Sequence, residues 1–118
     1  MNVLFLEYPK CSTCQKAKKW LDDHGVSYED RHIKEQNPTA GELKLWHEKS
    51  GRPLKNFFNT SGLVYKSLQL KDKLPSMSEE EQYQILSTDG MLVKRPLIVG
   101  PDFVLTGFKE AEWTDALL

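Results

Sequence analysis

Two cysteines stand three positions apart near the start of this 118-residue chain, and they are the side chains best suited to chemistry. Cys11 and Cys14 form a Cys-x-x-Cys pair within the segment Pro9-Lys10-Cys11-Ser12-Thr13-Cys14. Cysteines at this spacing support reversible thiol–disulfide exchange, in which the thiolate is the nucleophile. We therefore predict a redox pair: Cys11 attacks a substrate, and Cys14 then displaces the mixed disulfide and closes an internal one.

The pair lies between a predicted strand and a predicted helix. Residues 2–8 form a short apolar run that Pro9 ends, which indicates a buried strand. From residue 15 to residue 24, apolar side chains recur every three or four positions, which is typical of a helix that buries one face. The two cysteines are therefore expected at the N-terminus of the first helix.

This position predicts different roles for the two thiols. A helix N-terminus presents unpaired N–H groups and a partial positive charge, so a thiolate there is stabilised. We expect the pKa of Cys11 to be lowered, with Lys10 and Lys16 adding to the effect. Cys14 falls on the apolar face of the helix, which predicts a more buried, resolving thiol.

Two alternatives to redox chemistry are inert buried cysteines and a zinc site. Two inert buried cysteines would need apolar neighbours, whereas Ser12 and Thr13 are polar. A zinc site needs three or four ligands at suitable spacing. The histidines follow no such pattern with the cysteine pair: His24, His32 and His47. We therefore expect no metal site.

The remaining elements predict one α/β domain over residues 1–118. A second strand over residues 26–33 completes a β-α-β unit, whose strands should be parallel. Two capping boxes open helices in the middle of the chain, at Thr39–Glu42 and Ser78–Glu81. Two short strands joined by a tight turn, and then a last helix, follow at residues 96–99, 103–106 and 109–118. The helical insertion spans about residues 38–88.

A second group with chemical potential is Lys94-Arg95-Pro96, at the start of the third strand. A guanidinium group offers a planar set of donors to an oxyanion or a thiolate. Proline is tolerated at the head of a strand, and a cis bond before it is an option. The residues alone leave two alternatives open for Arg95: an anion-binding group facing the cysteines, or a solvated surface arginine.

Composition limits the classes of partner. Hydrophobic residues make up 39% of the chain and charged residues 28%, which is typical of a globular protein. Sixteen Lys and Arg against seventeen Asp and Glu give a net charge of −1, so no overall field attracts nucleic acid or an anionic membrane surface. No apolar stretch has the length of a membrane span, and the start of the chain lacks signal-peptide features. We expect a cytoplasmic protein with no direct contact to nucleic acid or membrane.

Three ordered motifs resemble the arsenate reductase (ArsC)/Spx/MgsR family of thioredoxin-like proteins, and they cover nearly the whole chain. They are Pro9 followed by Cys11–Cys14, the stretch from Phe58-Asn59-Thr60-Ser61-Gly62 through Leu70-Lys71-Asp72, and Lys94–Val99. The resemblance implies a thioredoxin-like fold, βαβ plus ββα, with a central helical insertion. It also implies a cis proline at Pro96, with Arg95 beside the active cysteine.

Two activities follow from the resemblance. Reductases of this family attack arsenate with the first cysteine, hold the anion with three arginines, and draw electrons from glutathione and glutaredoxin. Spx-type regulators use the pair as a redox switch and bind the C-terminal domain of the RNA polymerase α subunit. For the reductase we expect catalytic roles for Cys11, Cys14 and Arg95 and substrate contacts from Lys10, Ser12, Thr13 and Pro96, with no bound cofactor and an external thiol, thioredoxin-type or glutaredoxin-type reductant.

The chain departs from both patterns. Arg95 is the one match to the three arginines, because the other two positions fall within Asn59–Ser61 and Gly107–Lys109. Gly51 matches the glycine through which the regulators meet polymerase, whereas Ser61 stands where they carry an arginine. The sequence is most similar to uncharacterised reductase-like members that keep the cysteine pair and Arg95. The leading hypothesis is a thiol–disulfide oxidoreductase, and the alternative is an Spx-type regulator.

Overall fold

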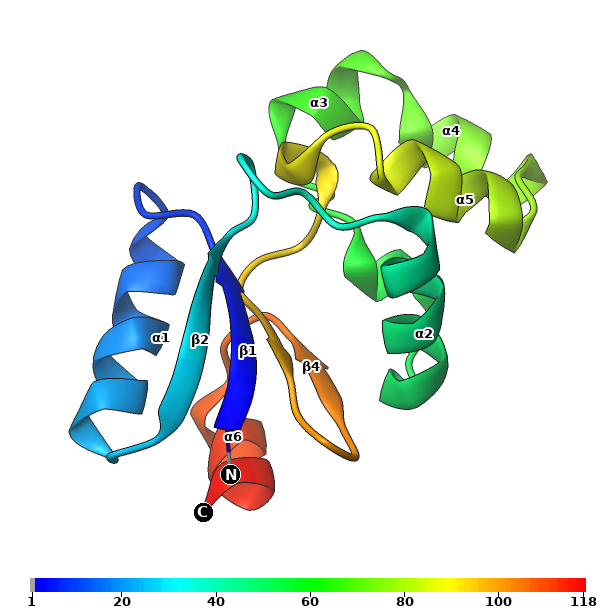
Figure 1. The fold of residues 1–118 in the computed structure, drawn as a ribbon. Helices are drawn as coiled ribbons and strands as arrows, with labels where there is room; N and C mark the ends of the chain where they lie inside the picture. The colour runs from blue at the N-terminus through cyan, green and yellow to red at the C-terminus, as the bar shows by residue number, and fades with distance from the viewer. Residues whose placement is uncertain (1) are drawn as a thin grey trace.

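A four-stranded mixed sheet forms the centre of the computed structural model, which describes residues 2–118 (Figure 1). The strand order is β2-β1-β3-β4; β1 pairs in parallel with β2 and antiparallel with β3, and β3 pairs antiparallel with β4. The strands are β1 (Asn2–Glu7), β2 (Ser27–His32), β3 (Leu97–Val99) and β4 (Val104–Thr106). This arrangement confirms the predicted α/β, thioredoxin-like fold.

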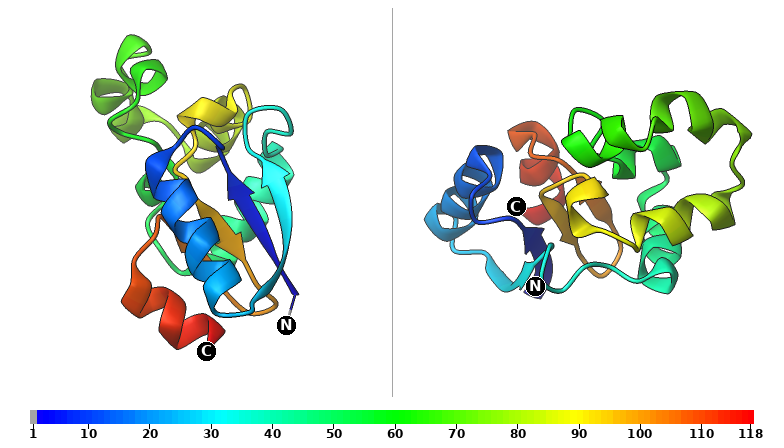
Figure 2. Two further views of the ribbon diagram at one scale, coloured as in Figure 1. Left: turned by 90° about the vertical axis from the view of Figure 1, so that its left-hand side faces the viewer. Right: turned by 90° about the horizontal axis from the view of Figure 1, so that it is seen from above.

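Helices α1 (Ser12–Asp23) and α6 (Glu110–Leu117) cover one face of the sheet (Figure 2, left). Their contact with the sheet is a compact apolar core that is rich in aromatic rings. Trp113 is fully buried at its centre, with edge-to-face contacts to the rings of Phe5 and Trp20. Alternate β1 residues, Val3 and Phe5, face this core, because successive side chains of a strand point to opposite faces of the sheet.

The helical insertion joins β2 to β3 and packs on the opposite face of the sheet (Figure 2, right). Side chains of the insertion, such as Leu43 and Phe57, form a second core with Leu6 and Leu97 of the sheet. The insertion comprises α2 (Ala40–Ser50), α3 (Leu63–Ser67), α4 (Leu70–Lys73), α5 (Glu79–Leu86) and the 3-10 turns η1 (Leu54–Phe57), η2 (Leu74–Ser76) and η3 (Gly90–Leu92). No helix in residues 2–118 is long and apolar enough to cross a membrane.

The helix starts follow the local sequence closely. Both predicted capping boxes form: the side chains of Thr39 and Ser78 accept the backbone N–H of Glu42 and Glu81, respectively. Helix α1, however, begins at Ser12 rather than near residue 15. Its first turn contains polar residues, so the spacing of apolar side chains does not indicate a helix there. Cys11 is therefore the N-cap residue of α1, with extended backbone angles and no side-chain cap.

An ion pair joins the end of β2 to the start of α2, and we expect it to stabilise the folded protein. Arg31 donates from Nη1 and Nη2 to the two carboxylate oxygens of Glu42 at 2.7 and 3.0 Å. Hydrogen bonding to Arg31, opposed by burial and aided by Thr39, lowers the pKa of Glu42 from 4.5 to about 2. The ionised Glu42 carboxylate therefore contributes its full stabilisation to the folded state above about pH 4.5. This contribution is lost as the pH falls towards 2.

We expect Glu42→Gln to lower the free energy of unfolding by about 1 kcal/mol at pH 7, since it removes the charge that pairs with Arg31, while the amide oxygen can still accept from the backbone N–H of Thr39. The difference from the unchanged protein should shrink between pH 4.5 and pH 2, where the native carboxylate becomes protonated. Urea unfolding at the two ends of this range measures the effect. Glu80→Gln, which removes the exposed pair with Lys44 at 3.3 Å, is the control and should change stability little. An equal loss in both variants would contradict the prediction.

Candidate active site

Cys11 lies at the N-terminus of α1 with its thiol half-buried. Its backbone N–H donates to the carbonyl of Tyr8 at 2.9 Å, which fixes the turn between β1 and α1. Burial alone would raise the pKa of the Cys11 thiol. Hydrogen bonds from the backbone N–H of Cys14 and Thr13, the Cys14 thiol and the charge of Arg95 outweigh that effect, so the pKa of Cys11 is lowered from its usual value. Both cysteines are free thiols in this structure.

Cys14 lies one turn further into α1 and is fully buried. Burial raises the pKa of its thiol to about 12, although a hydrogen bond from the backbone N–H of Tyr8 acts in the opposite direction. The sulfur of Cys11 and the carboxyl group of Glu7 raise it further. The pair therefore consists of one accessible thiol that ionises easily and one enclosed thiol that stays protonated.

Arg95 approaches the cysteines from the start of β3, and its peptide bond to Pro96 is cis. Its guanidinium carbon lies 5.5 Å from the centre of the Tyr8 ring, and Nη1 donates to the carbonyl of Met91 at 3.4 Å. Nε is buried and has no hydrogen-bond partner among residues 2–118. A buried donor without a partner is costly, so this atom is suited to receive an anion.

A cavity of about 420 Å³ adjoins Arg95. Its other walls come from Met91, from the segment before α3 and from the first turn of α3: Asn59, Ser61, Gly62, Leu63 and Val64. The Asn59–Gly62 motif thus borders the candidate site, although its residues were not among the expected site residues. The sequence shows Asn59–Gly62 only as a match to a family motif. The pattern of apolar residues gives no reason to expect this segment near the cysteines.

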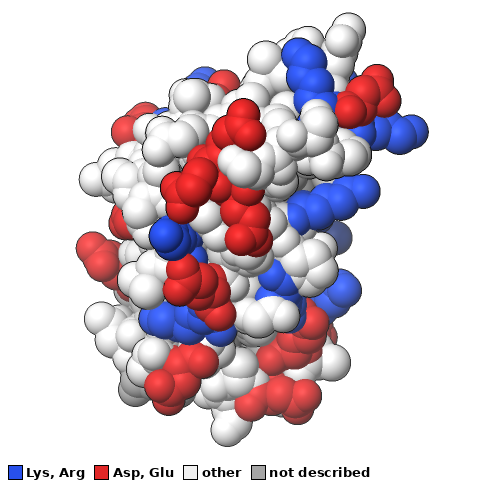
Figure 3. Space-filling view, turned by 90° about the vertical axis from the view of Figure 1, so that its right-hand side faces the viewer, with Lys and Arg blue, Asp and Glu red and all other residues white. Residues whose placement is uncertain are grey.

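A second, basic cavity of about 300 Å³ lies next to the first. Lys94, Thr60 and Lys109 line it, so the residue before Arg95 meets side chains from two distant segments of the chain. Lys55 adds a further cation, whereas the Arg52 guanidinium in the same lining pairs with Glu112 at 2.8 Å. Figure 3 shows lysine and arginine side chains gathered along one edge of the insertion, while acidic side chains occupy the middle of that face. The lysines that line this cavity, Lys55, Lys94 and Lys109, favour anionic ligands.

The other expected site residues have different surroundings. Lys10, Ser12 and Thr13 are exposed on the loop and first turn that carry Cys11, and Thr13 contributes its backbone N–H. Pro96 is buried at the head of β3. The cation with the largest effect on the pKa of Cys11 is Arg95, which lowers it, rather than Lys10 or Lys16. In residues 2–118 no three His, Cys, Asp or Glu side chains gather as they would around a metal ion.

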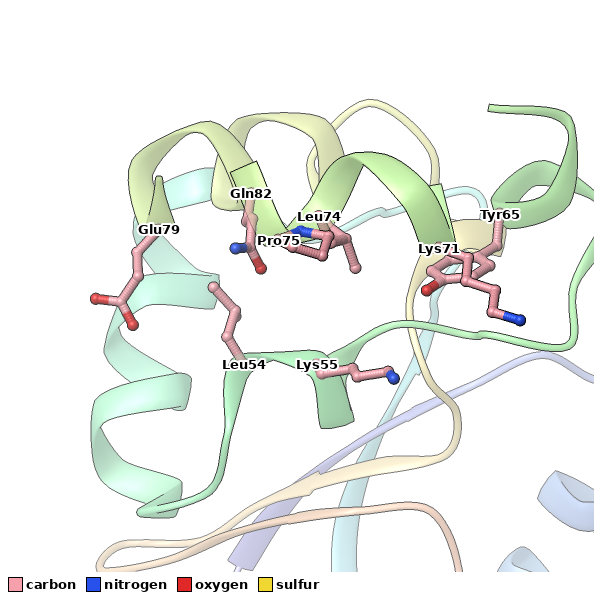
Figure 4. A pocket seen from close by; sticks show the side chains of 8 residues that line it. All are labelled: Leu54, Lys55, Tyr65, Lys71, Leu74, Pro75, Glu79 and Gln82. Carbon is pink, nitrogen blue, oxygen red and sulfur yellow. The ribbon is translucent and has the colours of Figure 1, made fainter. Parts of the chain in front are cut away.

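Another cavity, of about 310 Å³, lies within the insertion and contains none of the expected site residues (Figure 4). Leu54, Leu74 and Pro75 line its middle, Lys55 and Lys71 lie towards one end, and Glu79 lies at the other. Its walls come from the insertion alone. The chemistry of the cysteines therefore belongs to the junction of β1 and α1 and not to this cavity.

Comparison with known proteins gives matches along the whole chain. A model of the ArsC family matches residues 6–116. The crystal structure of an ArsC family related protein from Bacteroides fragilis has a TM-score of 0.94 and 59% identity, covering 98% of this chain and 97% of that chain. The uncharacterized protein YusI of Bacillus subtilis is 53% identical over 115 residues, 98% of each chain. The global transcriptional regulator Spx of Staphylococcus epidermidis is 28% identical over 112 residues, 95% of this chain and 83% of Spx. The resemblance inferred from the three motifs is confirmed.

Proposed function

Because the chain belongs to the ArsC family, we propose that it is a thiol–disulfide oxidoreductase in which Cys11 attacks the substrate and Cys14 resolves the product. With a disulfide substrate, the Cys11 thiolate bonds to one substrate sulfur and the other leaves as a thiolate. Cys14 then bonds to the Cys11 sulfur and releases the second substrate thiolate. Two electrons pass from the cysteine pair to the substrate, and an external thiol, glutathione or a thioredoxin-type or glutaredoxin-type protein returns them.

The observation that carries this proposal is the opposite effect of the structure on the two thiols. Partial burial is outweighed at Cys11, whose pKa is lowered, whereas burial raises the pKa of Cys14 to about 12. A partly accessible thiolate attacks first, and an enclosed thiol attacks only once a mixed disulfide is within its reach. This asymmetry is the one that an ordered two-step exchange requires.

Arg95 and the neighbouring lysines support an anionic substrate. The buried Nε of Arg95 lacks a partner among residues 2–118, and Lys94 and Lys109 line the adjacent basic cavity. An oxyanion, or a disulfide that carries carboxylate groups, would supply the missing acceptor. With one arginine in place of three, we expect a weaker hold on a doubly charged oxyanion than on a carboxylate-bearing disulfide.

The activation of Cys11 is tested by the pH dependence of its alkylation with iodoacetamide. Because the pKa of Cys11 is lowered, its reaction should level off at a lower pH than that of free glutathione, and at pH 7 it should be several-fold faster. Arg95→Gln should move the profile towards higher pH. Lys16→Gln is the matched control: it removes an exposed cation of α1 and should leave the profile unchanged. Equal rates for Cys11 and glutathione at pH 7 would refute the activation argument.

A second function, Spx-type regulation through the C-terminal domain of the RNA polymerase α subunit, is favoured by Gly51. This glycine ends α2 with φ of +65°, is exposed, and has open space around the position of a Cβ. It therefore presents a flat backbone surface to a partner. A pull-down with the α-subunit domain, using oxidised and reduced protein, separates the functions: binding that depends on redox state supports the regulator, and its absence together with disulfide turnover supports the enzyme.

A further inference from the structure

Glu7 is a buried carboxyl group at the C-terminal end of β1, and 5% of its surface is exposed. It continues the row of β1 side chains, Val3 and Phe5, that point towards α1. Carboxylates are rarely this buried without a cation directly bonded to them. Among residues 2–118 no ion pair is formed by Glu7, because the nearby Lys18 instead donates to Asp30 at 2.9 Å.

Glu7 follows Val3 and Phe5 on the side of β1 that α1 covers, and α1 carries the resolving cysteine on its buried face. The Cys14 sulfur accepts a hydrogen bond from the backbone N–H of Tyr8, the residue that follows Glu7, and the Glu7 charge acts on the Cys14 thiol. Cys14 is itself fully buried. A proton that leaves this thiol therefore needs an acceptor inside the protein.

The ionisable groups around Glu7 come from two elements. On α1 they are Cys14 and Lys18; on β2 they are Asp30, which hydrogen-bonds to Glu7, and His32, which pairs with Glu7 in the strand register. His32 directs Nδ1 to the backbone N–H of Lys34, at 3.2 Å, and therefore away from this role. Burial, followed by the Asp30 hydrogen bond and charge, raises the pKa of Glu7 to about 7, with Lys18 opposing. Glu7 therefore gains and loses its proton near neutral pH.

We propose that Glu7 accepts the proton of the Cys14 thiol when Cys14 attacks the mixed disulfide on Cys11, and returns it when the internal disulfide is reduced. This inference rests on the proposed function. In the forward step the S–H bond of Cys14 breaks, the proton passes to a Glu7 oxygen, the Cys14–Cys11 disulfide forms and the substrate thiolate leaves. In the reverse direction an external thiolate bonds to Cys11, and Cys14 departs with the proton from the Glu7 carboxyl group. No additional oxidant or reductant is required.

The charge of Glu7 and its proton-accepting role have opposite consequences. As a charge alone, Glu7 raises the pKa of Cys14 and hinders ionisation, so neutralising it would speed the attack by Cys14. As a proton acceptor, Glu7 removes the barrier to ionising a thiol whose pKa is about 12, so neutralising it would slow the attack. The sign of the effect therefore separates the two roles.

The test uses dithiobis(nitrobenzoate), which releases one coloured thionitrobenzoate when Cys11 attacks and a second when Cys14 resolves. In Glu7→Gln we expect the first phase to be unchanged within about two-fold and the second to slow by at least about ten-fold at pH 7. The second-phase rate of the unchanged protein should rise with pH and level off above about 7, the pKa of Glu7, whereas that of Glu7→Gln should keep rising. Glu7→Asp, which retains a carboxylate, should restore most of the second phase.

Glu29→Gln makes the same substitution at an exposed position on β2 and should change neither phase. A second phase in Glu7→Gln that is as fast as in the unchanged protein, or faster, overturns the assignment. If Glu7→Gln does not fold, the pH profile of the unchanged protein decides: a second phase without a bend near neutral pH overturns the assignment equally. Absence of the first phase in the unchanged protein would instead refute the proposed function, which separates the two failures.

Discussion

Replacing Cys11 by serine is expected to lower the rate of disulfide reduction by on the order of a thousand-fold or more, because a serine hydroxyl is not ionised at neutral pH and forms no disulfide. The fold should persist, since Cys11 is half-buried and caps α1 through its backbone without a side-chain bond. Turnover with a carboxylate-bearing disulfide and an external thiol measures the loss. Thermal unfolding confirms that the variant is folded.

Cys14→Ser is the matched variant, and it should stop the reaction one step later. Cys11 can still attack, but the fully buried residue at position 14 no longer resolves the product, so the mixed disulfide accumulates. Mass spectrometry of the intact protein should show the added substrate thiol on Cys11, and the protein bound in this form would identify a protein substrate. Full turnover by Cys14→Ser would mean that an external thiol performs the resolving step, and would contradict the role given to Cys14.

Gly90→Ala is expected to lower the free energy of unfolding by about 3 kcal/mol, the largest stability effect of the substitutions considered. Gly90 begins η3, where the insertion returns to the sheet, and it is buried. A Cβ at this position would overlap the backbone carbonyl of Ile33 and crowd Lys34. Because both obstacles are main-chain atoms, no side-chain rotation relieves them, and η3 must move away from the end of β2.

Gly41→Ala is the control for the same substitution in an open place. Its Cβ would have one neighbour within 4 Å, Thr39 Oγ1 at 4.0 Å, and it lies inside α2, where alanine is the better helix former. Stability should therefore be unchanged or rise by up to about 1 kcal/mol. Urea unfolding of both variants measures the contrast. Equal stability of Gly90→Ala and the unchanged protein would show that η3 packs less closely on Ile33 than the structure indicates.

The displacement of η3 would also be felt at the candidate site. Met91 follows Gly90 directly and lines the cavity beside Arg95, whose Nη1 donates to the Met91 carbonyl. We therefore expect the Gly90→Ala protein that remains folded to show a higher pKa for Cys11, as the Arg95 charge moves away. The alkylation profile of Cys11 measures this coupling.

The sequence alone determined the features that depend on near neighbours along the chain. The spacing of Cys11 and Cys14, the strand before them and the helix after them predicted the redox pair and its asymmetry. The capping boxes at Thr39 and Ser78 located two helices of the insertion, and both form as predicted. Each of these features depends on hydrogen bonds or apolar spacing within a few residues, so the local pattern carries enough information to predict it.

The approach of Arg95 to Cys11 was decided by the tertiary structure. The residues alone left Arg95 between an anion-binding group and a solvated arginine, and the family resemblance supplied the expectation. The antiparallel pairing of β3 with β1 brings the start of β3 to the end of β1, so the Arg95 charge reaches the thiol. Such pairing is set by the order of strands in the sheet, which no local pattern specifies.

Glu7 shows the same division most clearly. In the sequence it is only the polar residue at the end of an apolar run, and no sequence pattern gives it a role. Helix α1 above it and β2 beside it enclose its carboxyl group, and Asp30 lies close enough to oppose its ionisation. The burial of the Glu7 carboxyl group, and the charges that act on it, depend on residues that come together only when the chain folds. The sequence therefore predicts where the reactive sulfur lies, while the packing of α1 and β2 decides which group takes its partner's proton.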